Sequence, residues 1–403
     1  MPDLDSRLAR SRAALLDEID QPPLADVHRR AGRIRRRRAA RVGAAALALV
    51  AVVAVAARPW EATHRPPVTP AATPTVAAPV YRGAGVEITG LAPGTVLNLD
   101  GEVVDVEFSD ADHGLAFSIC QQSGCPALAK TSDGGLTWTA VALPAGVTND
   151  LQLLGFPGGR SLLVGPDVRF TTDDGGATWR EAAPATTATR PLIADGQLPQ
   201  LDLTSGTVTV WSPDQGPLGP LAQQPDLTVS WVAAAPTADG AWWVGGTAGG
   251  KPAVAVTRDA GATWQQTVLG VPSGAVETVR VGVLGTDVYA VASGETGLLR
   301  NIYYSSDGGK SFTATFAGGK PERVSGEPVP LLDGRLLLTG HDRADGTWWV
   351  SADDGKTFTA ATELPAVGTV NRTIAGYVAY RLFDSGWLAF STNGLTWQKL
   401  QLY

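Results

Sequence analysis

The chain has 403 residues with 47 Gly and 28 Pro, and only 18% of its residues are charged, which favours a turn-rich β protein over a helical one. Residues 1–41 hold 11 Arg against 6 Asp and Glu, a net charge of +5, so the rest carries −12 of the total of −7. A nucleic-acid surface needs a basic face, and the acidic remainder indicates none. The length suits one large repeat domain with appendages.

The first segment, residues 1–27, is predicted to be cytosolic and partly helical. Pro22 and Pro23 would end the helix, and Asp3 or Asp5 would cap it. Apolar residues mark one side of that helix: Leu4, Leu8, Leu15 and Ile19. A helix of about 16 residues is marginal in isolation. Two interpretations stay open, an untethered tail and a helix that binds a cytosolic partner.

An apolar segment then follows a dense cluster of arginines. Residues 42–57 hold no charged or polar side chain and are closed by Arg58. Sixteen helical residues rise about 24 Å, and snorkelling of Arg41 and Arg58 can extend this toward a hydrocarbon core of about 30 Å. We predict a transmembrane helix over 42–58, with the Arg-rich residues 1–41 in the cytoplasm and the rest outside the membrane. The alternative, a cleaved signal peptide, would have an unusually long leading region.

Residues 59–80 are rich in Pro, Thr and Ala and predict an extended stalk that spaces the following domain from the membrane.

Two cysteines, Cys120 and Cys125, are separated by four residues that include a glycine. This spacing predicts a disulfide at the tip of a hairpin in an oxidising compartment, with two free thiols as the alternative. A metal site would need more ligands than this segment offers.

The rest of the chain repeats an eight-residue turn motif: Ser/Thr, any, Asp, any, Gly, any, Ser/Thr, Trp/Phe. In the copy from Thr257 to Trp264 the Asp accepts backbone hydrogen bonds, the Gly supplies a positive φ, and the Trp buries roughly 200 Å² of ring. Full copies begin at 131, 172, 257, 305 and 351, and weaker ones at 212, without the aromatic, and at 391, one residue short. The residues given structural roles in these turns are Asp133, Gly135, Trp138, Asp174, Gly176, Trp179, Asp214, Gly216, Asp259, Gly261, Trp264, Asp307, Gly309, Phe312, Asp353, Gly355, Phe358, Asn393 and Trp397.

The copies begin 40 to 48 residues apart, a period that predicts one four-stranded blade per repeat. We therefore predict an all-β fold over residues 81–403, a β-propeller of seven blades, with six as the alternative because the copy at 212 is weak. In the first blade, strands are expected in 103–110, 113–120, 127–135 and 137–143. Residues 86–91 are expected to add a strand near the first and last blades and to help close the ring.

The turn motif resembles the Asp-box, or BNR, repeat of sialidases, sortilin-type receptors and photosystem II assembly factor propellers. The resemblance covers about 320 residues and implies that the turns lie on the outer rim, away from the central funnel, so that their Asp residues are neither catalytic nor calcium ligands.

The sialidases of this group hold a substrate carboxylate with three arginines, one of them in an Arg-Ile-Pro motif, and use a Tyr–Glu pair. This chain has no Arg-Ile-Pro, and no Glu is near Tyr377 or Tyr380 in the sequence. Propeller arginines that match no position of the triad are Arg160, Arg280, Arg300, Arg323, Arg372 and Arg381.

Other catalytic patterns are weaker still. Two of the four His, His28 and His64, lie outside the propeller region, which argues against a His-rich metal centre. Asp110, Asp112 and His113 fall where the first predicted strand turns into the second and are interpreted as a polar turn. We predict no catalytic, cofactor-binding or metal-binding residues and no cofactor.

These features predict a membrane-anchored extracytoplasmic propeller that acts as a binding or scaffolding module. Propellers bind in the central depression with loops from several blades, which suits a protein or glycan partner. Two alternatives stay open, a sialidase-type glycoside hydrolase and a transmembrane regulator whose residues 1–27 engage a cytosolic partner. The Arg- and Ala-rich anchor and the scarcity of Lys are typical of a high-GC bacterium.

Overall fold

The computed structural model describes residues 78–90, 102–119, 126–147, 151–165, 168–186, 188–272, 274–340, 346–380 and 387–400. They belong to one compact unit, Thr75–Tyr403. The predicted cytosolic tail, the predicted transmembrane helix over 42–58, nearly all of the stalk and both cysteines lie outside these residues. Within the described ranges, no helix is both long and apolar enough to cross a membrane.

The described strands form seven sheets, which we number as blades in chain order. Blades one to three contain β3 (Glu102–Phe108), β4 (Gly114–Ile119), β5 (Ala127–Thr131) and β6 (Thr139–Val141); β7 (Gln152–Phe156), β8 (Arg160–Val164), β9 (Arg169–Thr172) and β10 (Arg180–Glu181); and β11 (Leu198–Asp202), β12 (Thr207–Ser212) and β13 (Gly216–Pro220).

Blades four and five contain β14 (Thr228–Val232), β15 (Trp242–Ala248), β16 (Lys251–Thr257) and β17 (Gln265–Val268); and β18 (Thr278–Leu284), β19 (Asp287–Ser293), the short 3₁₀ helix η1 (Glu295–Gly297), β20 (Leu299–Ser305) and β21 (Thr313–Ala314). Blades six and seven contain β22 (Ser325–Pro330), β23 (Leu336–Gly340), β24 (Thr347–Ser351) and β25 (Thr359–Ala360); and β26 (Thr369–Arg372), β27 (Tyr377–Tyr380), β28 (Leu388–Ser391) and β29 (Thr396–Leu400).

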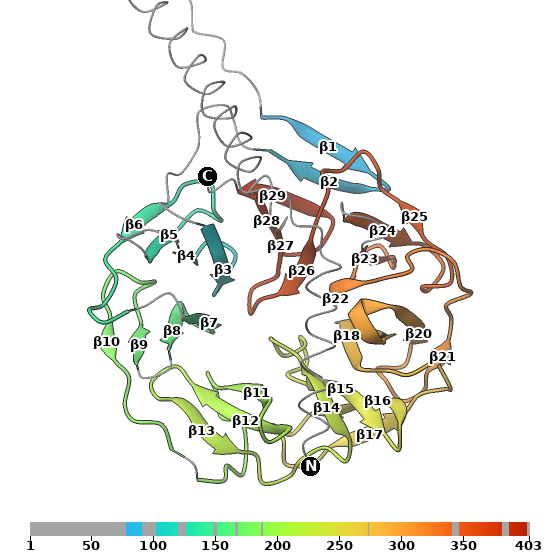
Figure 1. Ribbon diagram of the computed structural model, residues 1–403, viewed down its shortest axis with the longest axis horizontal. Helices are drawn as coiled ribbons and strands as arrows, with labels where there is room; N and C mark the ends of the chain where they lie inside the picture. Colours follow the sequence, from blue (N-terminus) through green and yellow to red (C-terminus); the bar gives the residue numbers. More distant parts are fainter. Residues whose placement is uncertain are drawn as a thin grey trace, which may run out of the picture. The chain divides into compact units, whose positions relative to one another are not determined.

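Figure 1 shows the seven sheets arranged in a ring, with the first strand of each nearest the axis. The fold is therefore a seven-bladed β-propeller, and the alternative of six blades is wrong. The four strands expected in the first blade are confirmed as β3 to β6. Neighbouring strands within each blade are antiparallel, so the turn after the first strand and the turn after the third lie at the same end of a four-stranded blade.

The third blade departs from the repeat because it has three strands. The segment before it, residues 183–186 and 188–190, runs parallel to β13 along its outer edge. The amides of Ala183, Thr186 and Arg190 donate to the carbonyls of Asp214, Pro217 and Pro220 at 2.9, 3.2 and 2.8 Å. This segment takes the place of a fourth strand and covers an edge that would otherwise be open.

The last blade carries two additional strands from the start of the described chain. β2 (Val86–Thr89) pairs in parallel with β29, and β1 (Val80–Gly83) pairs with β2, so the sheet has six strands. The expected strand near residues 86–91 is thus present, but it lies on the outer edge of the last blade. The ring closes through side chains, where the rings of Phe108 and Phe390 stack with their centroids 3.9 Å apart.

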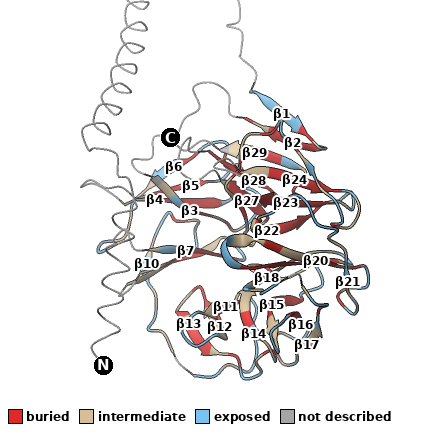
Figure 2. Cartoon of the chain, turned by 45° about the vertical axis from the view of Figure 1, so that its right-hand side comes forward, coloured by how far each residue is buried: buried red, intermediate tan, exposed pale blue. Residues whose placement is uncertain are grey.

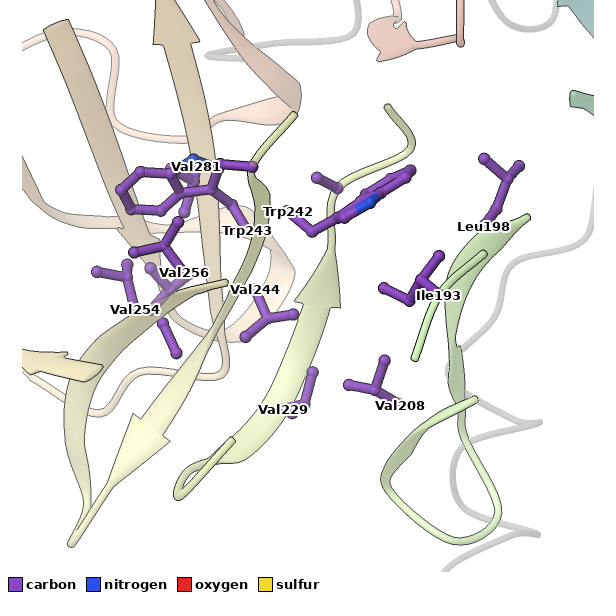
Figure 3. Packing of buried hydrophobic residues seen from close by; sticks show 14 of the residues in the cluster. Ile193, Leu198, Val208, Val229, Trp242, Trp243, Val244, Val254, Val256 and Val281 are labelled. Carbon is purple, nitrogen blue, oxygen red and sulfur yellow. The ribbon is translucent and has the colours of Figure 1, made fainter. Parts of the chain in front are cut away.

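The hydrophobic core lies between neighbouring blades, and Figure 2 shows that the buried residues follow the strands. Consecutive side chains of a strand point to opposite faces, so Trp242 and Trp243 of β15 serve two interfaces. In Figure 3, Trp242 points toward Ile193 and Leu198 of the preceding segment, whereas Trp243 points toward Val281 of the following blade. Stacking each blade on its neighbours therefore buries both of its faces.

Candidate functional site

Five turn motifs form the same set of hydrogen bonds, between the third and fourth strands of their blades. In the first, Asp133 Oδ1 accepts from Thr131 Oγ1 at 2.8 Å and from Thr137 N at 2.9 Å, and Oδ2 accepts from Thr137 Oγ1 at 2.6 Å. The Thr131 hydroxyl accepts in turn from Gly135 N at 2.8 Å. The equivalent bonds form around Asp174, Asp259, Asp307 and Asp353, and Asn393 accepts from the backbone of its own turn. These side chains hold turns together.

The hydrogen bonds lower the pKa of these carboxyl groups. The hydroxyl and amide of Thr178 hold the pKa of Asp174 at about 2, and those of Thr263 do the same for Asp259. At Asp133, burial raises the pKa, but the bonds from Thr137 and Thr131 outweigh it and leave a lowered value. Groups ionised throughout the neutral range in this way serve structure better than proton transfer.

The motif glycines have a second role that the motif alone does not reveal. Gly309 has a φ of +84°, and a Cβ added there would overlap the indole of Trp243 in the preceding blade. A Cβ at Gly176 would lie 2.7 Å from Leu115, and one at Gly355 would lie 2.9 Å from Ile302, again in the preceding blade. Each of these turns thus packs its glycine against the neighbouring blade.

The weak copy at 212 differs from the prediction that its Asp accepts hydrogen bonds within the turn. It forms the turn between β12 and β13 of the three-stranded blade, and the Asp214 carboxylate pairs with Arg160 at 2.5 Å and with Arg180 at 2.8 Å. Both arginines belong to the preceding blade. Asp214 therefore links two blades through ion pairs, in place of the turn hydrogen bonds predicted for it, because this turn joins different strands.

One cavity of about 750 Å³ opens at the end of the propeller that carries the first-strand turns, here called the pocket face. It is bounded by segments from blades four to seven: the loop after β14, the end of β18, the end of β22 and the β26–β27 region. Its walls are largely apolar, made by Ala233, Ala235, Pro236, Ala238, Val283, Leu284, Pro328, Pro330 and Leu332. Thr392 and Asn393 also line it, so the last turn motif borders the pocket, contrary to the expectation that these turns lie away from it.

Four residues of the pocket lining, here called the floor, are Trp231, Glu327, Arg372 and Tyr377. Trp231 Nε1 donates to Glu327 Oε1 at 2.7 Å, a bond that joins blade four to blade six across the inner end of blade five. The Arg372 guanidinium lies 4.5 Å from the centroid of the Tyr377 ring. Pro328 and Pro330 follow Glu327 in β22, and they are tolerated there because β22 is the end strand of its sheet and pairs on one side only.

Burial raises the pKa of Glu327 to about 7, although the bond from Trp231 and the charges of Arg280 and Arg372 act in the opposite direction. Neither arginine forms an ion pair with Glu327 within the described residues. The floor therefore holds one carboxyl group whose pKa burial raises, close to the positive charges of Arg280 and Arg372.

Two further acids, Asp105 and Glu107, lie on β3, the first strand of blade one. Asp105 Oδ2 accepts from Leu153 N at 2.9 Å, and burial raises the pKa of Asp105 to about 6. Burial, together with the charge of Asp105, raises the pKa of Glu107 well above its usual value. Tyr380 lies near both acids and accepts a hydrogen bond from the Asn371 side-chain amide, and burial raises its pKa.

The sequence candidates for chemistry are only partly brought together. Arg160, Arg300 and Arg323 bond to Asp173 and Asp214, to Ala275 O and to Thr296 O respectively, away from the floor. Arg381 lies outside the described residues. Asp110 accepts from the amides of Asp112 and His113, forming the turn before β4. No cluster of three or more His, Cys, Asp or Glu in the described ranges has the arrangement of a metal site.

Although no Glu is near Tyr377 in the sequence, the fold brings Glu327 from blade six into the same pocket. The sequence analysis missed Glu327, Trp231 and Asp105. All three occupy the first strand of a blade, as do Arg280 and Arg372. Comparing first strands across repeats, and looking for polar residues or tryptophan there, would have identified residues that face the axis.

No protein-family model and no curated protein sequence matches this chain. Solved structures that resemble it include YCF48 bound to D1 peptide, at 17% identity and a TM-score of 0.32, over 75% of this chain and 83% of that one. YCF48 from Cyanidioschyzon merolae has 14% identity and a TM-score of 0.41, over 73% and 94% of the two chains. A prolyl endopeptidase has 14% identity and a TM-score of 0.43, over 72% and 48%. The seven-bladed architecture itself follows from the sheet topology of this chain.

Proposed function

We propose that this protein is a membrane-anchored, extracytoplasmic binding or scaffolding module that holds a protein or glycan partner on its pocket face. The apolar segment 42–58 behind its Arg cluster supports the anchor and the orientation. In that oxidising location Cys120 and Cys125 form the disulfide proposed from their spacing.

The observation that carries the binding role is the pocket itself. Its volume of about 750 Å³ is within the range of roughly 300–1,000 Å³ typical of ligand sites. Its apolar walls surround a few polar groups, a combination that favours binding with a defined orientation. The loops that form it come from four blades held rigidly by the ring, which positions them without induced folding.

Affinity capture from the cell envelope tests this role with two matched variants. Leu332 is 65% exposed at the pocket and Val271 is 78% exposed on the β17–β18 connection, at the other end of the blades. Leu332→Arg and Val271→Arg make the same chemical change on the two faces. We expect quantitative mass spectrometry to find a partner that the wild type and Val271→Arg retain and that Leu332→Arg loses. Equal retention by all three proteins would contradict binding on the pocket face.

A sialidase-type glycosidase is the second candidate, favoured by the presence of Tyr377, Glu327 and Arg372 in one pocket. Two features weaken it. Glu327 accepts from Trp231, and burial raises the pKa of Tyr377, which works against a tyrosine nucleophile. Hydrolysis of a fluorogenic sialoside by the full chain, abolished by Tyr377→Phe, would establish this activity. The binding proposal predicts no turnover.

A further inference from the structure

We infer, resting on the binding role proposed above, that the pocket takes an extended, uncharged polypeptide segment and that Glu327 binds it in the protonated form, so that binding takes up a proton. The carboxyl O–H donates a hydrogen bond to a main-chain carbonyl of the segment.

The two oxygens of Glu327 have different surroundings. Oε1 accepts from Trp231 Nε1 at 2.7 Å, whereas Oε2 makes no hydrogen bond within the described residues. Glu327 lines the pocket, so its free oxygen is available to a ligand. A protonated carboxyl group that keeps Oε1 as the acceptor for Trp231 would present its O–H to the cavity as a donor.

The charged groups around Glu327 argue against a cationic ligand. Arg280 of β18 and Arg372 of β26 lie on either side of its strand, and both act on its ionisation. A lysine or arginine side chain entering the floor would meet these two positive charges. Arg372 is itself placed over the Tyr377 ring at 4.5 Å, a contact that an anionic ligand would have to compete with.

The remaining titratable groups leave the floor without a strong negative charge. Tyr377 of β27 shares the pocket with Glu327, whereas Tyr380 of the same strand packs against the first blade. Burial raises the pKa of both, so they remain neutral near pH 7. Asp105 and Glu107 of β3 act on Tyr380 from its other side. Asp239, which also lines the pocket, forms an ion pair with Arg258 at 3.6 Å. Glu327 is thus the floor group whose charge state changes with ligand binding.

The walls favour a polypeptide over a sugar. Alanines, prolines, valine and leucine dominate them, and Leu332 is 65% exposed at the pocket. A sugar would place hydroxyl groups against these walls without partners, at a cost in free energy. Small apolar side chains fit the walls, and one main-chain carbonyl satisfies the protonated carboxyl.

The expected dependence on pH follows from the titration of Glu327. Its pKa in the free protein is about 7 because of burial, and a bound segment that excludes water and accepts a hydrogen bond from the protonated carboxyl group raises that pKa further. If only the protonated form binds, the affinity falls about tenfold between pH 6 and pH 8. An isosteric amide at this position keeps both an acceptor for Trp231 and a donor for the ligand.

The test begins with a phage-displayed library of short random peptides, panned at pH 6 on the full-length protein and counter-selected on Leu332→Arg. Calorimetry of a synthetic selected peptide then gives the dissociation constant from pH 6 to pH 8. Two buffers with different ionisation enthalpies give the number of protons taken up. Glu327→Gln is the test variant, and Asp105→Asn controls for an acid on β3 whose pKa burial raises to about 6.

We expect the selected peptide to be uncharged. Its affinity for the wild type should fall about tenfold from pH 6 to pH 8, whereas its affinity for Glu327→Gln should stay constant at the level of the wild type at pH 6. Asp105→Asn should keep the wild-type profile. A pocket peptide with equal affinity at pH 6 and pH 8 would overturn proton uptake and leave the binding role standing. Acidic peptides lost in Arg372→Gln would overturn the ligand class. A failure to select any peptide that Leu332→Arg rejects would count against both the inference and the binding role.

Discussion

Single side chains in this protein divide into those that hold turns and those that face the axis. Asp133 and its counterparts accept three or more hydrogen bonds within one turn, which lowers their pKa. Glu327 has one hydrogen bond and a raised pKa because of its burial. The direction of the pKa shift therefore separates structural acids from the candidate site.

Among the side chains that hold turns, two residues at the same motif position should differ in how much they stabilise the protein. Asp133→Ala removes several hydrogen bonds to a carboxylate and leaves their donors unpaired, which should cost about 1–3 kcal/mol of stability. Asp214→Ala removes exposed ion pairs and should cost less than about 1 kcal/mol. Urea unfolding of both variants with unchanged slopes measures this difference. Equal losses would mean that the turn bonds do not stabilise the blade.

Glu327, one of the side chains that face the axis, should make the stability of the protein depend on pH. The folded-state pKa of Glu327, about 7, lies above its ordinary value of 4.5, so its stabilising contribution is complete below pH 4.5 and is lost as the pH rises through 7. Glu327→Gln stays neutral and escapes this loss. Its stability relative to the wild type should rise between pH 4.5 and pH 8 by at most about 3 kcal/mol. Thermal unfolding across this range measures the difference, with the exposed Glu277→Gln as control. Parallel profiles of stability against pH for Glu327→Gln and Glu277→Gln would contradict this prediction.

Elements are joined where a turn of one blade rests on a strand of the blade before it. The motif supplied a correct reason for glycine, a positive φ, but hid the second reason, the close approach to the preceding blade. Gly308 and Gly309 separate the two. Both have a positive φ, of +71° and +84°, yet a Cβ at Gly308 has its nearest neighbour at 3.6 Å, whereas one at Gly309 would overlap Trp243.

Alanine substitutions at these two positions isolate the contact between blades. Gly308→Ala should cost about 1–2 kcal/mol, the penalty of the left-handed backbone conformation. Gly309→Ala should cost at least about 1–3 kcal/mol more, because Trp243 or the turn must move. Chemical denaturation of both variants checks the prediction. Similar losses would show that the turn relaxes freely and that the contact is unimportant.

At the scale of the whole molecule, periodicity carried most of the fold. Repeats 40 to 48 residues apart led to seven blades, and their strand order led to the four strands of the first blade. The irregular third blade was not predictable, because the amides of Ala183, Thr186 and Arg190 cover β13 through backbone bonds that leave no side-chain pattern. The place of β2 beside β29 was only approximate, since it depends on residues far apart in the chain.

The candidate site was beyond the reach of the sequence for a similar reason. Trp231 and Glu327 are 96 residues apart, and their bond depends on the size and curvature of the closed ring. Arg372 was noted only as an arginine that matches no position of the sialidase triad, and Tyr377 only as a tyrosine with no Glu near it in the sequence. The floor is defined by which residues of first strands meet at the axis, and a motif located at the third turn of each blade carries no information on that.

The central claim is that a partner sits on the pocket face, and site-specific photo-cross-linking in living cells tests it most directly. A photoreactive amino acid replaces Leu332 at the pocket in one strain and Val271 at the opposite end of the blades in another. Binding in the pocket predicts a discrete cross-linked species from position 332 that position 271 does not give, and its loss when Trp231→Ala is added to a protein that remains folded. No species at 332, or the same species at both positions, would contradict the account.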